Sequence, residues 1–277
     1  MSSLKPLEVG CMFWVERDTI PSIAEMGVRC GQMGIGGDTQ ITPKFIDKIR
    51  EELGQNEIEV ISIVASYSGE DYADLPTVER TVGFIPRSTR AARLNRTLEL
   101  IEVAAKLGVP AIACHLGFVP SDKLNPDYLD VRNLVRHICD RAALHGQMFV
   151  LETGQEKAHE LLDFIEDVAR PNLKVNFDPA NMILYGSGDP HEAVGILKSK
   201  IVSVHAKDGD WPDPRDKRGL GKERPLGKGS VNFPKFIETL RSAGYTGTLC
   251  IEREAQDPEE RVADMRAAVP YLRGLIG

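Results

Sequence analysis

The sequence has no hydrophobic run long enough to cross a membrane. Its longest apolar runs are about the length of a strand, far short of the roughly 20 residues that a membrane helix needs. The N-terminal stretch MSSLKPLEVG has neither the charged start nor the apolar centre of a signal peptide. We therefore predict a cytoplasmic protein that has no membrane partner.

Basic charge and paired cysteines are also scarce. The formal net charge is −7 at pH 7, which disfavours a general nucleic-acid binder because such proteins usually carry a basic surplus. The five cysteines form no CxxC pair, and an odd number in predicted strands and helices indicates buried free thiols in a reducing compartment. They are Cys11, Cys30, Cys114, Cys139 and Cys250.

Eight apolar segments rich in Val, Ile and Leu recur along the chain, separated by segments with helical periodicity. The predicted strands span residues 7–15, 28–35, 58–66, 109–117, 148–154, 173–179, 201–207 and 247–254. They are apolar on both faces, as expected for parallel strands covered by helices. The pattern predicts the α/β class and a (β/α)8 TIM barrel, in a single domain over residues 1–277; a doubly wound sheet is the alternative.

Capping residues mark several of the predicted helices. Thr42 and Pro43 start one helix, which Gly54 is expected to close. Longer helices are expected to end at Gly108, Gly146 and Gly244. The segments 68–88 and 209–230 are predicted to be long loops, which in a compact domain are often functional.

Residues able to bind a metal ion stand at the carboxyl ends of four consecutive predicted strands. With the strand period of two, the inward phase carries Glu152, Asp178, His205 and Glu252. The fourth strand adds His115, for which we expect a role in substrate binding; a buried histidine with satisfied hydrogen bonds is the alternative. One polar residue at a strand end is usually a solvated terminus or a helix cap. Asp178, for example, could merely form a turn with Pro179. Four strands that all end in a residue able to bind a metal favour a shared site at the barrel face where TIM-barrel enzymes have their active sites.

Three carboxylates in one dry pocket would not all stay ionised without a cation. We therefore predict one divalent metal ion, held by three oxygen donors and one imidazole. This donor set suits Mn²⁺, which we expect, and is also compatible with Zn²⁺, Co²⁺ or Mg²⁺. The predicted ligands are Glu152, Asp178, His205 and Glu252.

The segment after the seventh strand carries further candidates for substrate binding. Lys207 is expected to reach toward whatever the metal binds; the alternative is a pair with Asp208 or Asp210 at the rim. Arg215 lies in a loop of mixed charge that could dock a phosphate or carboxylate, or could be an ordinary solvated loop or a subunit contact in a homo-oligomer. Trp211 could stack on a sugar or simply anchor the loop.

The stretch GKERPLGKGS superficially resembles a phosphate-binding loop. Five residues rather than four separate Gly221 from Gly227, and Gly229 stands where Ser or Thr should follow the lysine. We therefore do not expect a nucleotide site there.

Taken together, six motifs in this order resemble the xylose isomerase-like TIM barrels, specifically their sugar phosphate isomerase/epimerase group. The motifs are HLGF (115–118), LETG (151–154), NFDPAN (176–181), VHAKD (204–208), PLGKGSVNF (225–233) and CIERE (250–254). The resemblance implies a small-molecule sugar substrate, with Glu152 and Glu252 as the proton-transferring pair. Several ketose 3-epimerases have a substrate-contacting histidine where this chain has Asn181; that departure is compatible with phosphoketose 3-epimerases. The endonuclease IV-type relatives need additional histidines, and none precedes His115 here.

The reaction implied by this resemblance is metal-assisted removal of the proton next to a sugar carbonyl, through a metal-stabilised enediolate. Return of the proton from the opposite face gives epimerisation, and return to the neighbouring carbon gives aldose–ketose isomerisation. If a leaving group lies β to the carbonyl, the same residues would make a 3-keto-glycoside lyase that cleaves C-glycosides. A metal-dependent sugar-binding subunit without turnover is the remaining alternative, and Glu252→Gln would distinguish it, because only an enzyme should lose turnover.

Overall fold

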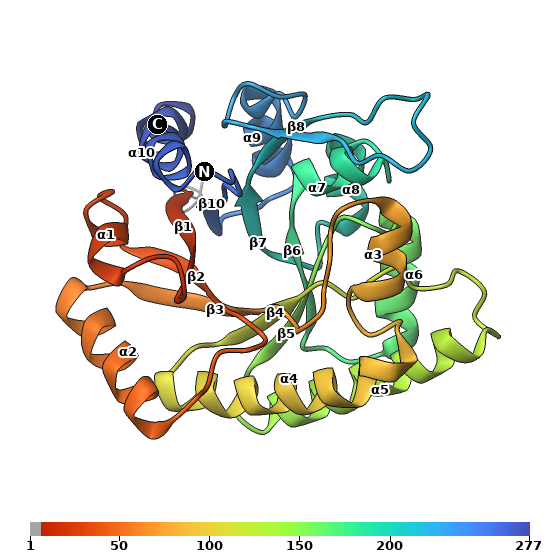
Figure 1. Ribbon diagram of the computed structural model, residues 1–277. Coiled ribbons are helices and arrows are strands. Elements are labelled where there is room, and N and C mark those ends of the chain that lie inside the picture. The colour runs from red at the N-terminus through yellow and green to blue at the C-terminus, as the bar shows by residue number, and fades with distance from the viewer. Residues whose placement is uncertain (1–6) are drawn as a thin grey trace.

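The computed structural model describes residues 7–277, in which eight parallel strands form a closed barrel surrounded by helices (Figure 1). The strands are β1 (Glu8–Trp14), β2 (Cys30–Ile35), β3 (Glu59–Ala65), β4 (Ala111–Cys114), β5 (Met148–Glu152), β6 (Leu173–Phe177), β7 (Ile201–Ala206) and β10 (Thr248–Ile251). Pairing of Glu8 in β1 with Thr248 in β10 closes the ring. The predicted (β/α)8 barrel is confirmed, and the doubly wound alternative is wrong.

The observed strands are shorter than predicted, mainly at their carboxyl ends. Strands β6 and β10 stop at Phe177 and Ile251, so that Asp178 and Glu252 are the first residues beyond the sheet. Asp178 is the N-cap of the helix that begins at Pro179, and the main-chain N–H of Glu252 still donates to Ala206 O in β7 at 3.2 Å. The inward phase read from the strand period nevertheless continues to these positions.

Ten helices lie among the described residues, and most of them pack around the barrel. They are α1 (Ile20–Ala24), α2 (Pro43–Asn56), α3 (Leu75–Thr81), α4 (Arg87–Leu107), α5 (Pro126–Ala143), α6 (Ala158–Val168), α7 (Pro179–Tyr185), α8 (Pro190–Leu197), α9 (Phe233–Ser242) and α10 (Pro258–Ile276). The predicted end of α4 at Gly108 is confirmed, since this residue adopts φ 74°. The predicted end of α2 at Gly54 is wrong, because the helix continues to Asn56 and Glu57 takes the left-handed conformation instead, with φ 54°.

The two segments predicted to be loops contain regular structure. Segment 68–88 holds α3, which begins where the Asp74 carboxylate accepts the main-chain N–H of Thr77 at 2.9 Å. Segment 209–230 contains β9 (Lys222–Arg224), which pairs antiparallel with β8 (Asp208–Asp210). Each of the two predicted long loops therefore contains a short regular element that was not predicted. Short elements of this kind are fixed by caps and long-range pairing rather than by hydrophobic periodicity.

The barrel interior is divided between an apolar and a polar layer. A small cluster of buried apolar side chains fills one part: Met12, Val64, Ala111, Ala113 and Val150. A second, polar group inside the barrel comprises Gln32, Ser62, Asn176 and Ser203, all nearly inaccessible to solvent. A much larger apolar cluster joins the outer face of the strands to the helices. All five cysteines are buried and free, as predicted.

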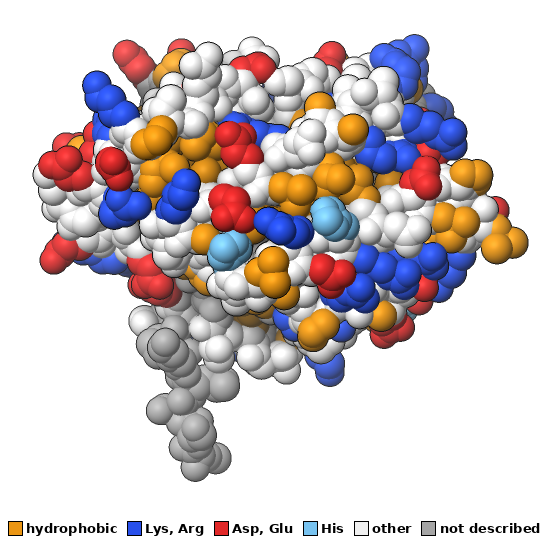
Figure 2. All heavy atoms as spheres, turned by 90° about the horizontal axis from the view of Figure 1, so that it is seen from below, with side chains coloured by type: hydrophobic (Ala, Val, Ile, Leu, Met, Phe, Trp, Pro, Cys, Tyr) orange, Lys and Arg blue, Asp and Glu red, His pale blue; other side chains and the backbone are white. Residues whose placement is uncertain are grey.

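Helices α4 and α5 form an outer face on which acidic and basic side chains are intermixed (Figure 2). The two helices are joined by ion pairs from Arg87 to Asp127 at 2.7 Å and from Arg90 to Asp127 and Asp130 at 2.8 and 3.1 Å. Within residues 7–277, none of the helices has the length and apolar character that a membrane crossing requires.

Candidate active site and metal centre

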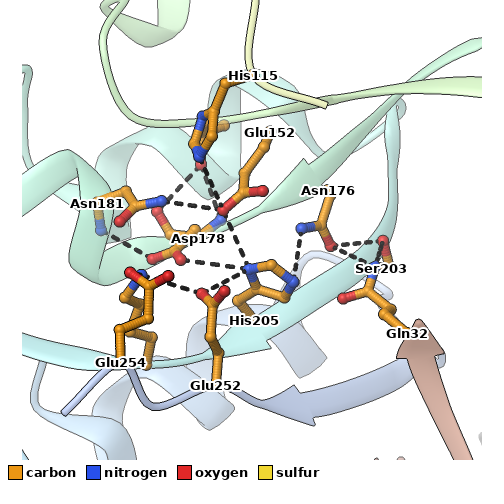
Figure 3. Close-up of polar contacts among 12 residues, drawn as sticks. Gln32, His115, Glu152, Asn176, Asp178, Asn181, Ser203, His205, Glu252 and Glu254 are labelled. Carbon is orange, nitrogen blue, oxygen red and sulfur yellow. Dashed lines mark hydrogen bonds and ion pairs between the residues drawn. The ribbon is translucent and has the colours of Figure 1, made fainter. Parts of the chain in front are cut away.

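Four side chains from four neighbouring strands meet above the barrel (Figure 3). His205 Nδ1 lies 3.1 Å from Glu152 Oε1, 3.4 Å from Asp178 Oδ2 and 3.1 Å from Glu252 Oε2. One ligand atom from each of the four residues lies within 4.8 Å of the others, and all four residues are buried. We call this group the four-residue cluster; it consists of Glu152, Asp178, His205 and Glu252.

The polar layer inside the barrel orients the imidazole of His205. The Asn176 side-chain amide lies 3.1 Å from His205 Nε2, so that Nδ1 points at the three carboxylates. Asn176 Oδ1 accepts hydrogen bonds from Ser203 Oγ at 2.6 Å and Gln32 Nε2 at 3.2 Å, and Gln32 Nε2 also donates to Ser62 Oγ at 2.9 Å. Since both Asn176 and His205 are 0% exposed, the ring has little freedom to turn away.

Without a cation, the surroundings shift the pKa values of the cluster residues in different directions. Burial opposes ionisation of Glu252, yet His205 and Lys207 hold its pKa well below the usual value. Burial likewise acts against the charged form of His205, but Glu252 and Glu152 raise its pKa well above the usual value. For Asp178 burial prevails, and the pKa of this carboxyl is raised.

The donor set and one unsatisfied oxygen fit a divalent cation. Glu252 Oε2 lies 3.1 Å from both His205 Nδ1 and Lys207 Nζ. Asp178 Oδ2, by contrast, is buried and receives no hydrogen bond of good geometry from the described residues, although it faces His205 Nδ1. Buried carboxylate oxygens are rarely left in this state unless an ion or water completes the site. Three carboxylates and one imidazole could therefore hold one divalent metal ion.

The Asp178 carboxylate has a second role as a helix cap. Its Oδ1 accepts the main-chain N–H of Asn181 at 2.8 Å and so begins α7, while Oδ2 faces the cluster. The hydroxyl of Thr153 both accepts from Asp178 N at 2.8 Å and donates to Asp178 O at 3.0 Å. Helix capping and metal-ligand geometry are thus compatible at this residue, and neither excludes the other.

The structure brings three of the five predicted substrate-binding residues to the cluster. Asn181 Nδ2 donates to Glu152 Oε1 at 3.0 Å, and His115 Nε2 lies 3.5 Å from the same oxygen. Lys207 Nζ lies 3.1 Å from both Glu252 Oε2 and Glu254 Oε2, so the alternative pairing with Asp208 or Asp210 is wrong. All three side chains line a cleft that opens from the cluster.

The other two predicted substrate-binding residues lie outside this cleft. Arg215 is bound to Asp213 at 2.6 Å, and its side chain is 89% exposed. Trp211 is 47% exposed and does not line the cleft. Arg215 therefore satisfies its charge within its own loop, and the structure gives Trp211 no position over the cluster.

The glycine-rich stretch at 227–231 binds a carboxylate of the chain itself. Asp208 Oδ2 accepts the N–H groups of Gly227 and Gly229, both at 2.9 Å, and its Oδ1 accepts that of Val231 at 3.1 Å. The main-chain donors that a phosphate-binding loop would offer to a ligand are thus already occupied. The geometry agrees with the prediction that this is not a nucleotide site.

Several cleft residues were missed by sequence reasoning. The cleft is also lined by Trp14, Arg17, Ser66, Tyr72, Tyr185, Glu223 and Glu254. Trp14 and Ser66 stand at the ends of the first and third predicted strands, so the same reading of strand ends could have found them. Tyr185 comes from α7, Glu223 from β9 and Tyr72 from the segment before α3, where the sequence carries no comparable signal.

Comparison with known proteins agrees with this architecture. The family model described as "Xylose isomerase-like TIM barrel" matches residues 20–275. The crystal structure of a xylose isomerase domain protein from Planctomyces limnophilus is 38% identical, with a TM-score of 0.92 over 98% of this chain and 97% of that one.

Two similar proteins carry the name of an activity. L-ribulose-5-phosphate 3-epimerase UlaE of Escherichia coli is 41% identical over 73 residues, which are 26% of this chain and 23% of the epimerase. A D-psicose 3-epimerase structure determined in the presence of D-fructose is 17% identical with a TM-score of 0.72, over 98% of this chain and all of that one. At that identity the likeness concerns the fold. From the family match and the closed barrel together, the chain belongs to the xylose isomerase-like TIM barrel family.

Proposed function

We propose that this protein is a divalent-metal-dependent sugar isomerase that epimerises a keto sugar by moving the proton next to its carbonyl. The observation that carries the proposal is the convergence of Glu152 and Glu252 on one candidate metal centre at the carboxyl end of the barrel. The names of the two epimerases described above support the same reaction class.

In this proposal the four-residue cluster holds the cation, for which Mn²⁺ is the first candidate. When bound, a divalent cation polarises the sugar carbonyl and so makes the neighbouring C–H group more acidic. The cation would also take up the charge of the three carboxylates, which otherwise repel one another in a buried site.

The two glutamates are well placed to exchange a proton with a substrate. Figure 3 shows both glutamates turned toward His205 Nδ1, with Glu152 above it and Glu252 below it in this view. His205 and Lys207, which outweigh the effect of burial, keep the pKa of Glu252 low, so this carboxylate is ionised and can accept the proton. Against the effect of burial, His115 and His205 lower the pKa of Glu152, so this carboxylate, next to Asn181, must first take up a proton. It would then deliver that proton to the opposite face of the same carbon, which inverts its configuration.

The neighbours of the glutamates would orient the substrate. Lys207 stays protonated, because Glu252 and Glu254 raise its pKa well above the usual value in spite of burial. Its ammonium group can therefore donate to a substrate oxygen on which negative charge develops. His115 Nδ1 is buried without a partner among the described residues, and its ring lies in the cleft wall, where a sugar hydroxyl could reach it.

Metal-stripped and Mn²⁺-reloaded protein, assayed for epimer formation by NMR on a panel of keto sugars, would test the proposal. Turnover should require the metal, and Glu252→Gln and Glu152→Gln should each lower kcat by about 10²- to 10⁴-fold. Glu254→Gln is the matched control, because it also removes a carboxylate beside Lys207 but lies outside the cluster; its loss should stay below about tenfold.

The same assay separates the alternatives. Release of a leaving group without an epimer would indicate the lyase, and metal and sugar binding without turnover would indicate the binding subunit. Metal-independent turnover, or full activity of Glu252→Gln, would refute the proposed mechanism.

A further inference from the structure

The cleft above the four-residue cluster continues into a second compartment. The inner compartment, of about 430 Å³, contains Glu152, Lys207 and Glu252. The outer compartment, of about 770 Å³, lies between segments 36–39 and 66–70. Both are lined by the same four residues: Trp14, Arg17, Ser66 and Tyr72. Because the two compartments share this wall, a single elongated molecule could occupy both.

The wall of the outer compartment is held in place by internal contacts. Glu70 accepts the main-chain N–H groups of Tyr67 and Gly83, both at 2.9 Å, which fixes the turn after β3. Gly37 packs so tightly against this turn that an added Cβ would lie 2.2 Å from Ser68 N. The outer compartment is therefore a defined surface between two loops that are packed backbone to backbone.

The charge of the lining opposes a phosphorylated substrate. Among the described residues, seven carboxylates line the two compartments: Glu16, Asp38, Glu70, Glu152, Glu223, Glu252 and Glu254. The cationic side chains are Arg17 and Lys207, and Lys207 is already paired with two of the carboxylates. When Asp178 of the cluster, Arg253, which pairs with Glu223 at 3.1 Å, and a divalent cation are also counted, negative charges exceed positive ones by three. A phosphate dianion would be repelled, whereas sugar hydroxyls can donate hydrogen bonds to carboxylates.

Aromatic side chains stand where the two compartments meet. Trp14 and Tyr72 border both, and Tyr72 is 40% exposed. Aromatic rings pack well against the C–H faces of a neutral ring while leaving its hydroxyls free to bond. The guanidinium of Arg17 lies over the Trp14 ring, 5.6 Å from its centroid, and can donate to a hydroxyl or a glycosidic oxygen there.

We propose that the substrate is an uncharged glycoside, with the reacting sugar at the four-residue cluster and a second ring in the outer compartment. The inference rests on the proposed function and specifies its substrate class. A glycosidic bond removes the carbonyl at the anomeric carbon, so the reacting carbonyl must be a ketone at another ring carbon. The reaction that supplies this substrate must then be the oxidation of a ring hydroxyl of a glycoside.

Three matched substrates test this assignment on the Mn²⁺-loaded enzyme: a methyl oxo-glycoside, the corresponding oxo-disaccharide, and the methyl oxo-glycoside carrying a 6-phosphate. We expect kcat/KM for the disaccharide to exceed that for the methyl glycoside by at least about tenfold, because only the disaccharide fills both compartments. The phosphorylated compound should be at least about tenfold poorer than its parent, with a gap that narrows as salt increases.

Substitution of Ser68 locates the effect in the outer compartment. Ser68 is exposed and lines this compartment but not the inner one. Ser68→Phe should abolish the preference for the disaccharide while leaving turnover of the methyl glycoside within about twofold, and Ser68→Ala should retain the preference. If Ser68→Phe does not fold, the substrate comparison on the wild type decides by itself.

Equal kcat/KM for disaccharide and methyl glycoside, or a better phosphorylated substrate, would overturn the inference. So would turnover of free or phosphorylated ketoses with no turnover of either glycoside, although the proposed function would then stand. If no compound of any class loses a proton next to its carbonyl, the proposed function itself fails.

Discussion

Glu156 offers a quantitative test of how burial acts on a carboxyl group near the site. Glu156 stands four residues after the end of β5 and is 6% exposed. Its Oε1 has no hydrogen-bond partner among the described residues. Burial raises the pKa of Glu156 from 4.5 to about 7, against the opposing effect of the main-chain N–H groups of Glu156 and Val119. The folded protein therefore prefers the protonated acid.

The sign and size of the effect on stability follow from this shift. A carboxyl with a raised pKa stabilises the fold below its unfolded pKa of 4.5, and this contribution is lost as the pH rises through about 7. A difference of about 2.5 pH units corresponds to roughly 3 kcal/mol of unfolding free energy, since each unit is worth about 1.4 kcal/mol. Glu156→Gln keeps the shape of the protonated acid and cannot ionise, so it should not suffer this loss.

Thermal unfolding between pH 5 and pH 8 measures the difference. For a chain of this length about 2 °C per kcal/mol is expected, so Glu156→Gln should gain roughly 6 °C over the wild type at pH 8 and little at pH 5. Glu160→Gln is the control, because Glu160 lines the same small cavity but is exposed. Parallel pH–stability curves for the wild type and Glu156→Gln would refute the reasoning.

Three further predictions concern the site and its loop. Asn176→Leu should weaken Mn²⁺ binding about 10- to 100-fold by calorimetry, because it removes the side-chain amide whose Nδ2 lies 3.1 Å from His205 Nε2 and holds the ring in place; an unchanged Kd would contradict this. Mn²⁺ binding should tighten by up to about tenfold per pH unit near neutrality, because Glu252 and Glu152 raise the pKa of His205 against the effect of burial and the metal must displace the proton of this residue. A constant Kd from pH 6 to 8 would argue otherwise. Asp208→Asn should cost about 2–4 kcal/mol of unfolding free energy in denaturant titrations, because two main-chain N–H groups would face an amide NH₂. Asp210→Asn at the exposed rim should cost less than about 1 kcal/mol, and equal costs would refute the role of Asp208.

The barrel fold could be predicted, and so could the meeting of the four cluster residues at one site, because both depend on local periodicity. Parallel strands buried on both faces leave a strong apolar signal, and the period of two carries the inward phase one residue beyond the sheet to Asp178 and Glu252. The sequence indicated only a possible turn at Asp178 and Pro179, whereas Asp178 caps α7, which begins at Pro179.

Contacts that depend on the relative register of strands could not be predicted in this way. Lys207 pairs with Glu252 because β7 and β10 are adjacent and Cys250 lies beside His205, a relation that spans 45 residues of sequence. Asp208 and Asp210 are closer to Lys207 in the sequence. However, β7 ends at Ala206 and the chain turns there, so both acids face the 222–231 segment. Similarly, nothing local to Gly54 shows that Glu57 would provide the left-handed residue.

Deuterium exchange tests the central claim most directly. The Mn²⁺-loaded protein, freed of excess metal, is incubated in D₂O with ketoses, ketose phosphates and oxo-glycosides, and the carbon next to each carbonyl is followed by NMR. The account predicts deuterium uptake at that carbon with the wild type and at least about a hundredfold slower uptake with Glu252→Gln. Uptake that is unchanged in Glu252→Gln, or a protein that binds no divalent metal, would contradict it.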